Sequence, residues 1–299
     1  MSFAETLYHT CQTDSARCAA LSQAKLVDLT PNTLPWYDIK LLQLESLFLL
    51  DKTDHLLDAL TEATPIPTDA PQEFNLKVYV YFAKVYLKER QLNLSEQYAK
   101  LASDIFRDML TRAPQPSVYL DFSNLLTLEH HIANAQNNEK KAQLKLSEAI
   151  NNLLALEKSS QASNDPIFYR ELYGNLGHVY MFDSNFNNAL KAYDSSLFWT
   201  KQGQSEQQLA VAEFNVGKAL KALQRYENAM RHFEQASMHA FLSQDMNTYV
   251  TAQLNMAVCN VQLTDIDKAS SILSNVEDFR FTATQKQLFE SIQTDVQSK

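Results

Sequence analysis

The sequence predicts an all-α protein built as an α-solenoid of antiparallel helix pairs. One segment occurs three times, and its copies lie 40 residues apart, at Leu176-Gly177, Val216-Gly217 and Met256-Ala257. A fixed period of roughly 20–50 residues is typical of solenoids. Glycine is scarce, at 4 of the 299 residues, and apolar residues recur with the period of a helix. Such a chain usually offers an extended binding surface rather than a catalytic pocket.

The three copies alternate small and large residues at positions that stay aligned without a gap. In the first copy, Gly177 and Ala189 let two helices approach closely, and Tyr193 fills the space between them. The same places are occupied in the later copies by Gly217, Ala229 and Phe233, and then by Ala257, Ala269 and Leu273. The pattern predicts one tightly packed helix hairpin in each copy.

Helix boundaries along the chain follow from proline, asparagine and the apolar period. We expect helices over residues 4–29, 36–50, 54–61, 72–90, 94–110, 118–135 and 139–156, then the three hairpins, and a last helix over 284–297. The proline-rich segment 64–71 and the polar segment 159–165 are expected to be linkers. The total is about fourteen helices, and no stretch indicates a strand.

Charge and cysteine content narrow the class of protein. The net charge of −9 argues against nucleic acid or an anionic membrane as the main partner. On one continuous helix, Cys11 and Cys18 would lie about 10 Å apart, which is too far for a disulfide. We therefore expect free thiols in a reducing compartment. With no signal peptide and no apolar run long enough to span a membrane, the sequence predicts a soluble, cytoplasmic protein.

The repeat resembles the tetratricopeptide repeat (TPR). The signature positions of that family fall on Tyr173, Leu176, Gly177, Tyr180, Ala189, Tyr193 and Ser196 in the first copy, with Lys201 where the family often has proline. The second copy is similar, and in the third Asn260 replaces the aromatic residue. The resemblance implies a right-handed superhelix. Its 40-residue period is similar to the long-repeat subclass of kinesin light chain, cell-polarity adaptors and peptide-sensing bacterial regulators.

The resemblance suggests four segments along the chain. Residues 1–64 are expected to form divergent TPR-like N-terminal helices, and residues 72–158 divergent TPR-like helix pairs. Residues 166–277 hold the three clear repeats, and residues 282–299 are expected to form a helix that caps the stack.

An asparagine recurs on the first helix of each clear copy, at Asn175, Asn215 and Asn255, and Asn124 fits the same place upstream. An amide can pair with both the C=O and the N–H of an extended peptide. The resemblance implies that this row clamps a peptide backbone in a concave groove. The neighbouring residues expected to select the ligand are Glu171, His178, Phe214, Lys218, Lys221 and Leu254. A structural role, with each amide bonded inside the chain, is the alternative.

No motif predicts catalysis, a metal or a cofactor. The four glycines, at 174, 177, 203 and 217, build no phosphate-binding loop, and no HExxH or GxSxG sequence occurs. We expect Glu129-His130-His131 to lie on a solvated helix face, because adjacent helical residues point in different directions. His232 and His239 have no carboxylate on their own helix stripe and are expected to be ordinary helix residues.

The sequence thus predicts a non-catalytic scaffold that mediates protein–protein interaction and binds an extended peptide or partner segment in a concave groove. No catalytic residue, cofactor, nucleic-acid partner or membrane partner is expected. The alternative is a regulatory or sensory TPR region of a bacterial signalling system. Its partner would then be a transcriptional regulator or a cyclic-dinucleotide enzyme.

Overall fold

The computed structural model describes residues 7–8, 10–11, 14–160, 165–203 and 205–298. These residues contain fourteen α-helices and no strand, as the sequence predicts. The predicted start of the first helix at residue 4 and residues 161–164 of the polar segment lie outside the described residues. The chain divides into two compact units, residues 1–149 and 150–299, and the boundary falls within α8 (Glu139–Ser159). None of the described helices is long and apolar enough to cross a membrane.

The first unit is built around aromatic packing. Its helices before α8 are α2 (Ser15–Leu26), α3 (Leu34–Leu49), α4 (Thr53–Glu62), α5 (Gln72–Lys88), α6 (Leu92–Arg112) and α7 (Pro116–Ala135). One buried cluster joins Trp36 and Leu44 of α3, Leu60 of α4, and Phe74 and Phe82 of α5. The proline-rich segment 64–71 therefore connects helices that share a core.

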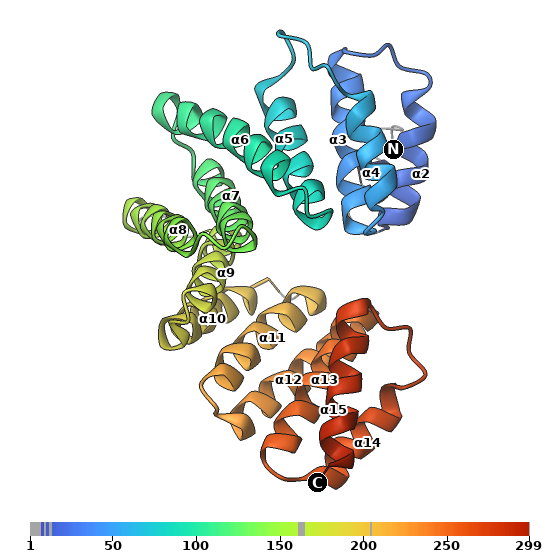
Figure 1. The fold of residues 1–299 in the computed structure, drawn as a ribbon, viewed down its shortest axis with the longest axis vertical. Helices are drawn as coiled ribbons and strands as arrows, with labels where there is room; N and C mark the ends of the chain where they lie inside the picture. Colours follow the sequence, from blue (N-terminus) through green and yellow to red (C-terminus); the bar gives the residue numbers. More distant parts are fainter. Residues whose placement is uncertain (1–6, 9, 12–13, 161–164, 204, 299) are drawn as a thin grey trace. The chain divides into compact units, whose positions relative to one another are not determined.

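The second unit repeats one helix pair three times (Figure 1). Its helices are α9 (Pro166–Phe182), α10 (Phe186–Thr200), α11 (Glu206–Ala222), α12 (Tyr226–Leu242), α13 (Met246–Gln262), α14 (Ile266–Val276) and α15 (Ala283–Gln297). The first helices of the pairs, α9, α11 and α13, each have 17 residues. The side chains of Asp165, Ser205 and Asp245 cap them by accepting a bond from a backbone N–H of the first turn. The sequence period is thus also the structural period.

Glycine and an aromatic ring fit together inside the hairpins, which confirms the predicted small–large packing. A Cβ atom added at Gly177 would lie 2.3 Å from the ring of Tyr193. A Cβ atom at Gly217 would lie 2.7 Å from the ring of Phe233. Both rings are fully buried. In these two pairs, a larger residue than glycine would therefore require the ring to shift.

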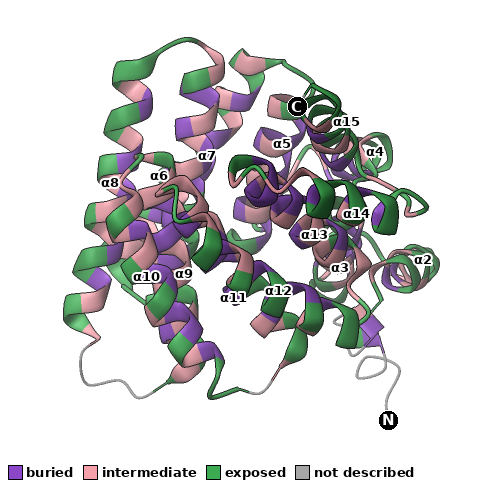
Figure 2. Cartoon of the chain, turned by 90° about the horizontal axis from the view of Figure 1, so that it is seen from below, coloured by how far each residue is buried: buried purple, intermediate pink, exposed green. Residues whose placement is uncertain are grey.

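Helix α15 covers the last repeat. Ile292 of α15 packs into a buried cluster with Leu254 of α13 and Leu273 of α14. The amide of Gln285 donates to the backbone oxygen of Asn247 and to the hydroxyl of Thr251. Figure 2 shows many buried residues in α13, whereas most residues of α15 are exposed or half-buried. The apolar side of α15 thus covers apolar residues of α13 and α14.

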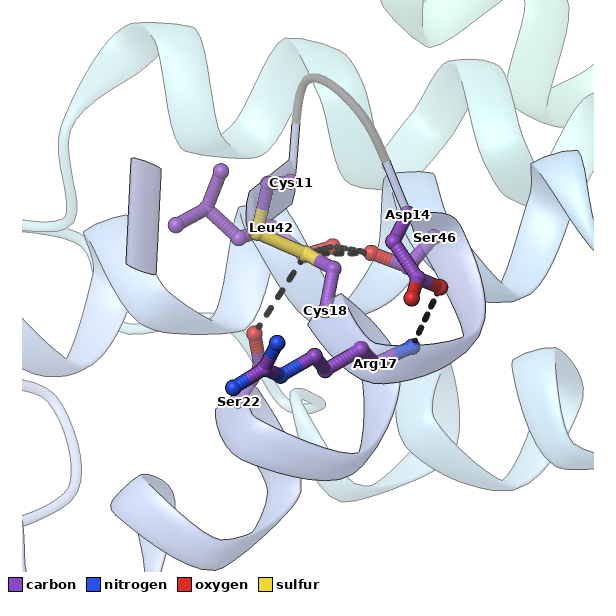
Figure 3. The surroundings of a disulfide bond; sticks show 7 residues. All are labelled: Cys11, Asp14, Arg17, Cys18, Ser22, Leu42 and Ser46. Carbon is purple, nitrogen blue, oxygen red and sulfur yellow. Dashed lines mark hydrogen bonds between the residues drawn. A yellow bond between two sulfur atoms is a disulfide. The ribbon is translucent and has the colours of Figure 1, made fainter. Parts of the chain in front are cut away.

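A disulfide joins Cys11 and Cys18, so the expectation of two free thiols is wrong (Figure 3). Their Cα atoms lie 4.7 Å apart, because Cys11 precedes α2 and is not part of one continuous helix with Cys18. The side chain of Asp14 accepts a bond from the backbone N–H of Arg17 and starts α2 at Ser15. The thiol pattern therefore does not indicate a reducing compartment. Cys259 is a buried free thiol, and burial raises its pKa to about 11.

The Glu129-His130-His131 segment does not lie on a solvated face, contrary to expectation. His130 is buried, and its ring nitrogens contact the backbone oxygen of Ala142 and the amide of Asn134. Glu129 forms an ion pair of 2.8 Å with Lys145 of α8. Residues of α8 therefore cover this side of α7, and the pattern of α7 by itself does not reveal that contact.

Candidate functional site

A cavity lies between the first helices of the first two repeats. It has a volume of about 280 Å³. Helix α9 lines it with Arg170, Glu171, Gly174, Asn175 and His178, α10 with Ser196 and Thr200, and α11 with Gln207, Gln208, Val211, Ala212 and Asn215. We call the side of α9, α11 and α13 that carries Asn175, Asn215 and Asn255 the asparagine face. The structure thus brings four predicted site residues, Glu171, Asn175, His178 and Asn215, to one cavity.

The three asparagines are not equivalent. Within the described part of the chain, the amides of Asn175 and Asn215 have no hydrogen-bond partner, and both line the cavity. The amide of Asn255 is bonded at both ends. Its oxygen accepts from Lys221 Nζ at 2.5 Å, and its nitrogen donates to the backbone oxygen of Thr251 at 2.8 Å. The first two amides are therefore unpaired within the described residues, whereas the amide of Asn255 is bonded inside the chain.

His178 forms one wall of the cavity and is held by the aromatic residue of its own hairpin. The Tyr193 hydroxyl lies 2.9 Å from His178 Nδ1. Burial, followed by the charge of Lys218, lowers the pKa of His178 to about 4. The imidazole is therefore neutral at pH 7. If Tyr193 donates to Nδ1, then Nε2 carries the proton and is the hydrogen-bond donor that remains.

Two lysines follow along α11, and burial lowers the pKa of both Lys218 and Lys221. In the described residues, no carboxylate lies within 4.0 Å of either ammonium group. Lys221 is bound by Asn255, whereas Lys218 has no hydrogen-bond partner among the same residues. A half-buried ammonium without a counter-charge attracts an anionic or carbonyl-rich group.

Two other predicted site residues belong to the core. Leu254 is fully buried and packs with the residues of α14 and α15, so a ligand on the asparagine face cannot contact its side chain. Phe214 is half-buried and packs against the ring of Phe233, with 5.4 Å between ring centroids. Asn124 lies in the first unit, at a separate cavity.

Sequence reasoning missed the polar rim of the cavity. Arg170 Nη1 donates to the side-chain oxygen of Gln208 at 2.5 Å, and Nη2 lies 3.2 Å from Glu171. Ser196 donates to the backbone oxygen of Arg170 at 2.9 Å and so links α10 to α9. Arg170 and Gln208 are 38 residues apart and fall outside the aligned positions, so the repeat gave no signal for their contact.

Sequence reasoning also missed the carboxylate partners of two histidines, since they lie on a neighbouring helix. His232 Nδ1 is 2.7 Å from Glu213, which also lies 3.3 Å from Lys201 Nζ. His239 Nδ1 is 2.5 Å from Glu206. Burial raises the pKa of Glu213, but the bonds from His232 and Lys201 outweigh it and leave the pKa below its usual value. These pairs connect α10, α11 and α12.

Chemically, the site offers binding groups. In the described residues, no group of three or more His, Cys, Asp or Glu side chains could hold a metal ion. The cavity instead presents two free amides, a neutral imidazole and an arginine that contacts a glutamine and a glutamate. Amides and an imidazole suit the hydrogen-bonding groups of a polar ligand such as a peptide backbone.

Repeated helix pairs stacked on one another define an all-α solenoid repeat protein. Neither a family model nor a curated protein matches the sequence. Solved structures do match. A Signal Transduction ATPase with Numerous Domains protein with a tetratricopeptide repeat sensor, from Pyrococcus horikoshii, superposes with a TM-score of 0.60 and 15% identity. The match covers 88% of this chain and 38% of that one, so this chain spans less than half of that protein.

Two further structures show the same fold. A Rap protein complexed with competence and sporulation factor has a TM-score of 0.56 and 17% identity, over 96% of this chain and 76% of that chain. TPR-like repeats of a kinesin light chain from Podosopora anserina have a TM-score of 0.50 and 15% identity, over 78% of this chain and all of that chain. The protein therefore has a fold of the tetratricopeptide repeat type.

Proposed function

We propose that the protein is a non-catalytic interaction module that binds an extended peptide segment of a partner protein on the asparagine face. The observation that carries the proposal is the cavity of about 280 Å³ between α9 and α11, lined by two amides without partners in the described chain. Most polar groups inside a packed protein are hydrogen-bonded, so two unpaired amides that line one cavity are candidates for ligand contacts. Asn175 and Asn215 are therefore assigned to the ligand.

The spacing of the two amides suits an extended chain. Packed helices lie about 8–10 Å apart, and an extended peptide advances about 3.3 Å per residue. Asn175 and Asn215 then meet backbone groups about three residues apart. Each clamp contributes about 0.5–1.5 kcal/mol net, so the pair fixes the peptide's direction and register more than it supplies the total affinity.

The groups beside the asparagines set the chemistry of the peptide. His178 offers a neutral hydrogen-bonding ring, and Lys218 is the next charged residue on α11 after Asn215. No carboxylate in the described chain neutralises Lys218. A peptide with an acidic side chain at this end of the cavity gains a charge-assisted contact that a neutral peptide lacks.

The comparisons support a ligand on this fold and suggest a wider setting. One similar structure is a Rap protein complexed with competence and sporulation factor, and another contains a TPR sensor within a signal-transduction ATPase. A second candidate function follows from the latter, because this chain spans only 38% of that protein. The chain then acts as the sensory region of a signalling system, and peptide binding on the same face is its input.

The test begins with random peptides displayed on phage and selected on the wild-type protein, followed by fluorescence-polarisation measurement of one selected peptide. Asn175→Ala with Asn215→Ala is expected to weaken binding by about 5- to 100-fold, as two lost hydrogen bonds imply. The matched control is Asn187→Ala on the exposed side of α10, which is expected to leave affinity unchanged.

Circular dichroism and thermal melting establish that each variant is folded. Equal affinity of the double variant and the wild type would refute the asparagine face as the site. Selected peptides that retain affinity for the double variant but lose it for a first-unit variant would place the binding elsewhere in the chain.

A further inference from the structure

The first unit contains a cavity at the equivalent place between two successive first helices. Helix α5 lines it with Lys77, Val80, Tyr81 and Lys84, spaced i, i+3, i+4 and i+7. On α9, the residues that line the other cavity, Glu171, Gly174, Asn175 and His178, have the same spacing. In both places the following first helix adds an asparagine, Asn124 of α7 or Asn215 of α11. The repeat architecture therefore provides a binding position twice.

The first-unit cavity has an apolar floor below a polar rim. Its floor consists of Leu76, Val80, Phe106, Leu125 and Leu128, and its volume is about 120 Å³. A dry cavity of roughly 150 Å³ holds a benzene molecule. The first-unit cavity therefore has room for one apolar side chain of about the size of leucine.

The rim of this cavity carries a cation that aromatic rings hold in place. Lys84 Nζ lies 4.4 Å from the ring centroid of Phe48 and 5.6 Å from that of Tyr81. No carboxylate in the described residues is within 4.0 Å of Lys84, and the rim carboxylate of Asp121 lies 3.9 Å from Lys77 instead. Burial and then the charge of Lys77 lower the pKa of Lys84, against the smaller opposite influences of Asp121 and Glu45. The ammonium of Lys84 is therefore open to an anionic partner.

The amide of Asn124 completes the rim. Asn124 is exposed and has no hydrogen-bond partner in the described part of the chain. It lies one helical turn before Leu128, which forms part of the floor. A peptide backbone that crosses this rim thus meets a free amide beside an apolar pocket.

We propose that this cavity is a second peptide-binding site, which takes an extended segment with an apolar residue in the pocket and an acidic residue two positions away on Lys84. In an extended chain, residues i and i+2 point to the same side, about 6.6 Å apart. One residue then fills the apolar floor while the other reaches the ammonium at the rim. The site lies in the other unit from Asn175 and Asn215, so it goes beyond the function proposed above.

The test uses the full chain with ¹³C-labelled leucine and valine methyl groups, observed by NMR. The probe is the peptide acetyl-Ser-Leu-Ser-Asp-Ser-amide. Saturable shifts are expected at Val80, Leu125 and Leu128. Replacing the probe's leucine by alanine is expected to weaken binding about tenfold, because most of the apolar burial is lost. Replacing its aspartate by lysine is expected to weaken binding by a similar factor.

Two protein variants and one control complete the design. Val80→Phe fills the pocket and is expected to abolish the shifts, and Lys84→Met is expected to remove the preference for aspartate over lysine in the probe. Lys100→Met, on the exposed side of α6, is the charge control and is expected to bind normally. The probe series alone decides the question if Val80→Phe does not fold.

Three results would overturn the inference: no shift at the three floor residues, equal affinity of the leucine and alanine probes, or equal affinity of the aspartate and lysine probes. Shifts confined to residues of α9 and α11 would overturn it while supporting the function proposed for the asparagine face. If peptide binding at the asparagine face were lost while the shifts at the floor residues remained, the function proposed for the asparagine face would be refuted and the second site would be supported.

Discussion

Two intervals separate the first helices of the three repeats: the first lies between α9 and α11, and the second between α11 and α13. Both have the same repeat architecture, yet within the described residues only the first leaves its asparagine unpaired. In the first interval, Asn215 lines a cavity and has no partner in the described chain. In the second, the equivalent Asn255 accepts a hydrogen bond from Lys221. The residue equivalent to Lys221 in the first interval is Met181, which cannot donate a hydrogen bond. A difference at one position of the repeat, Lys221 or Met181, thus accompanies the difference between a bonded and an unpaired asparagine.

A second difference concerns the aromatic residue of each hairpin. Tyr193 bonds to His178 in the first repeat, whereas Phe233 and Lys218 occupy the equivalent places in the second. Phenylalanine offers no hydroxyl, so the side chain of Lys218 is not tied to its own hairpin. The shared positions build the scaffold, and the positions that vary between copies set the chemistry of each interval.

Acid should destabilise the first interval through His178, and this is the largest effect that we expect. The folded pKa of about 4 lies below the ordinary value of 6.5, so the unfolded chain binds the proton more readily. Stability therefore falls as the pH drops from about 6.5 towards 4, by up to about 3 kcal/mol, and then levels off. Urea unfolding at pH 7, 6 and 5 measures this slope, and His178→Gln should flatten it.

The control for this prediction is Glu213→Gln. Because the folded pKa of Glu213 is lowered, its contribution is present above the unfolded value and is lost as the pH falls through the folded one. That loss occurs at more acidic pH than the onset of the His178 effect. Equal slopes for wild type and His178→Gln between pH 6.5 and 5 would contradict the assignment.

The variant Asn255→Ala tests the structural role in the second interval. It removes the partner of the Lys221 ammonium, so we expect the free energy of unfolding to fall by about 1–2 kcal/mol. Affinity for the selected peptide should stay unchanged. Chemical denaturation and fluorescence polarisation measure the two quantities. A loss of affinity without a loss of stability would make Asn255 a ligand-binding residue like Asn215.

The glycines test whether the two hairpins are packed alike. An added methyl group would meet Tyr193 at 2.3 Å in Gly177→Ala and Phe233 at 2.7 Å in Gly217→Ala. Overpacking costs about 1–3 kcal/mol, and the higher helix propensity of alanine offsets about 1 kcal/mol of that. We expect both variants to melt at lower temperature, with the larger decrease for Gly177→Ala. An unchanged melting temperature in either variant would show that the ring can move aside.

The variant Met181→Lys should give Asn215 of the first interval the lysine partner that Asn255 has in the second. The new ammonium is placed to bind Asn215 as Lys221 binds Asn255. Peptide affinity should then fall by about the value of one clamp, roughly 0.5–1.5 kcal/mol, or about 2- to 10-fold. Met181→Leu is the control without a donor. A loss of the same size in Met181→Leu would point to packing rather than to competition for the amide.

Much of the second unit was predictable from single positions in the repeat. The helices α9, α11 and α13 recur at the predicted period, and Gly177 meets Tyr193 as the small–large pattern requires. The unpaired amides of Asn175 and Asn215 were predictable only as candidate binding groups. The pattern placed Asn175, Asn215 and Asn255 on one face, but it could not tell which of them has a partner in the chain.

The sequence-based predictions that failed share a physical cause. A contact between two helices depends on their relative rotation and offset, which the sequence of one helix does not give. His232 finds its carboxylate on α11, and His130 is covered from α8, although neither partner follows from the histidine's own helix. The Cys11–Cys18 disulfide forms because Asp14 begins a new helix between the two cysteines. Distances measured along one ideal helix do not apply across such a break.

The sequence by itself determined most of the helices, the period of 40 residues and the small–large packing, because these depend on local propensity and on residues that repeat in register. The tertiary structure decided which polar side chains are free. A hydrogen bond requires donor and acceptor within about 3 Å, and side chains from neighbouring helices reach that distance only after the pairs have packed. Lys221 and Asn255 satisfy this condition, whereas Asn175 and Asn215 have no such partner in the described chain and line a cavity.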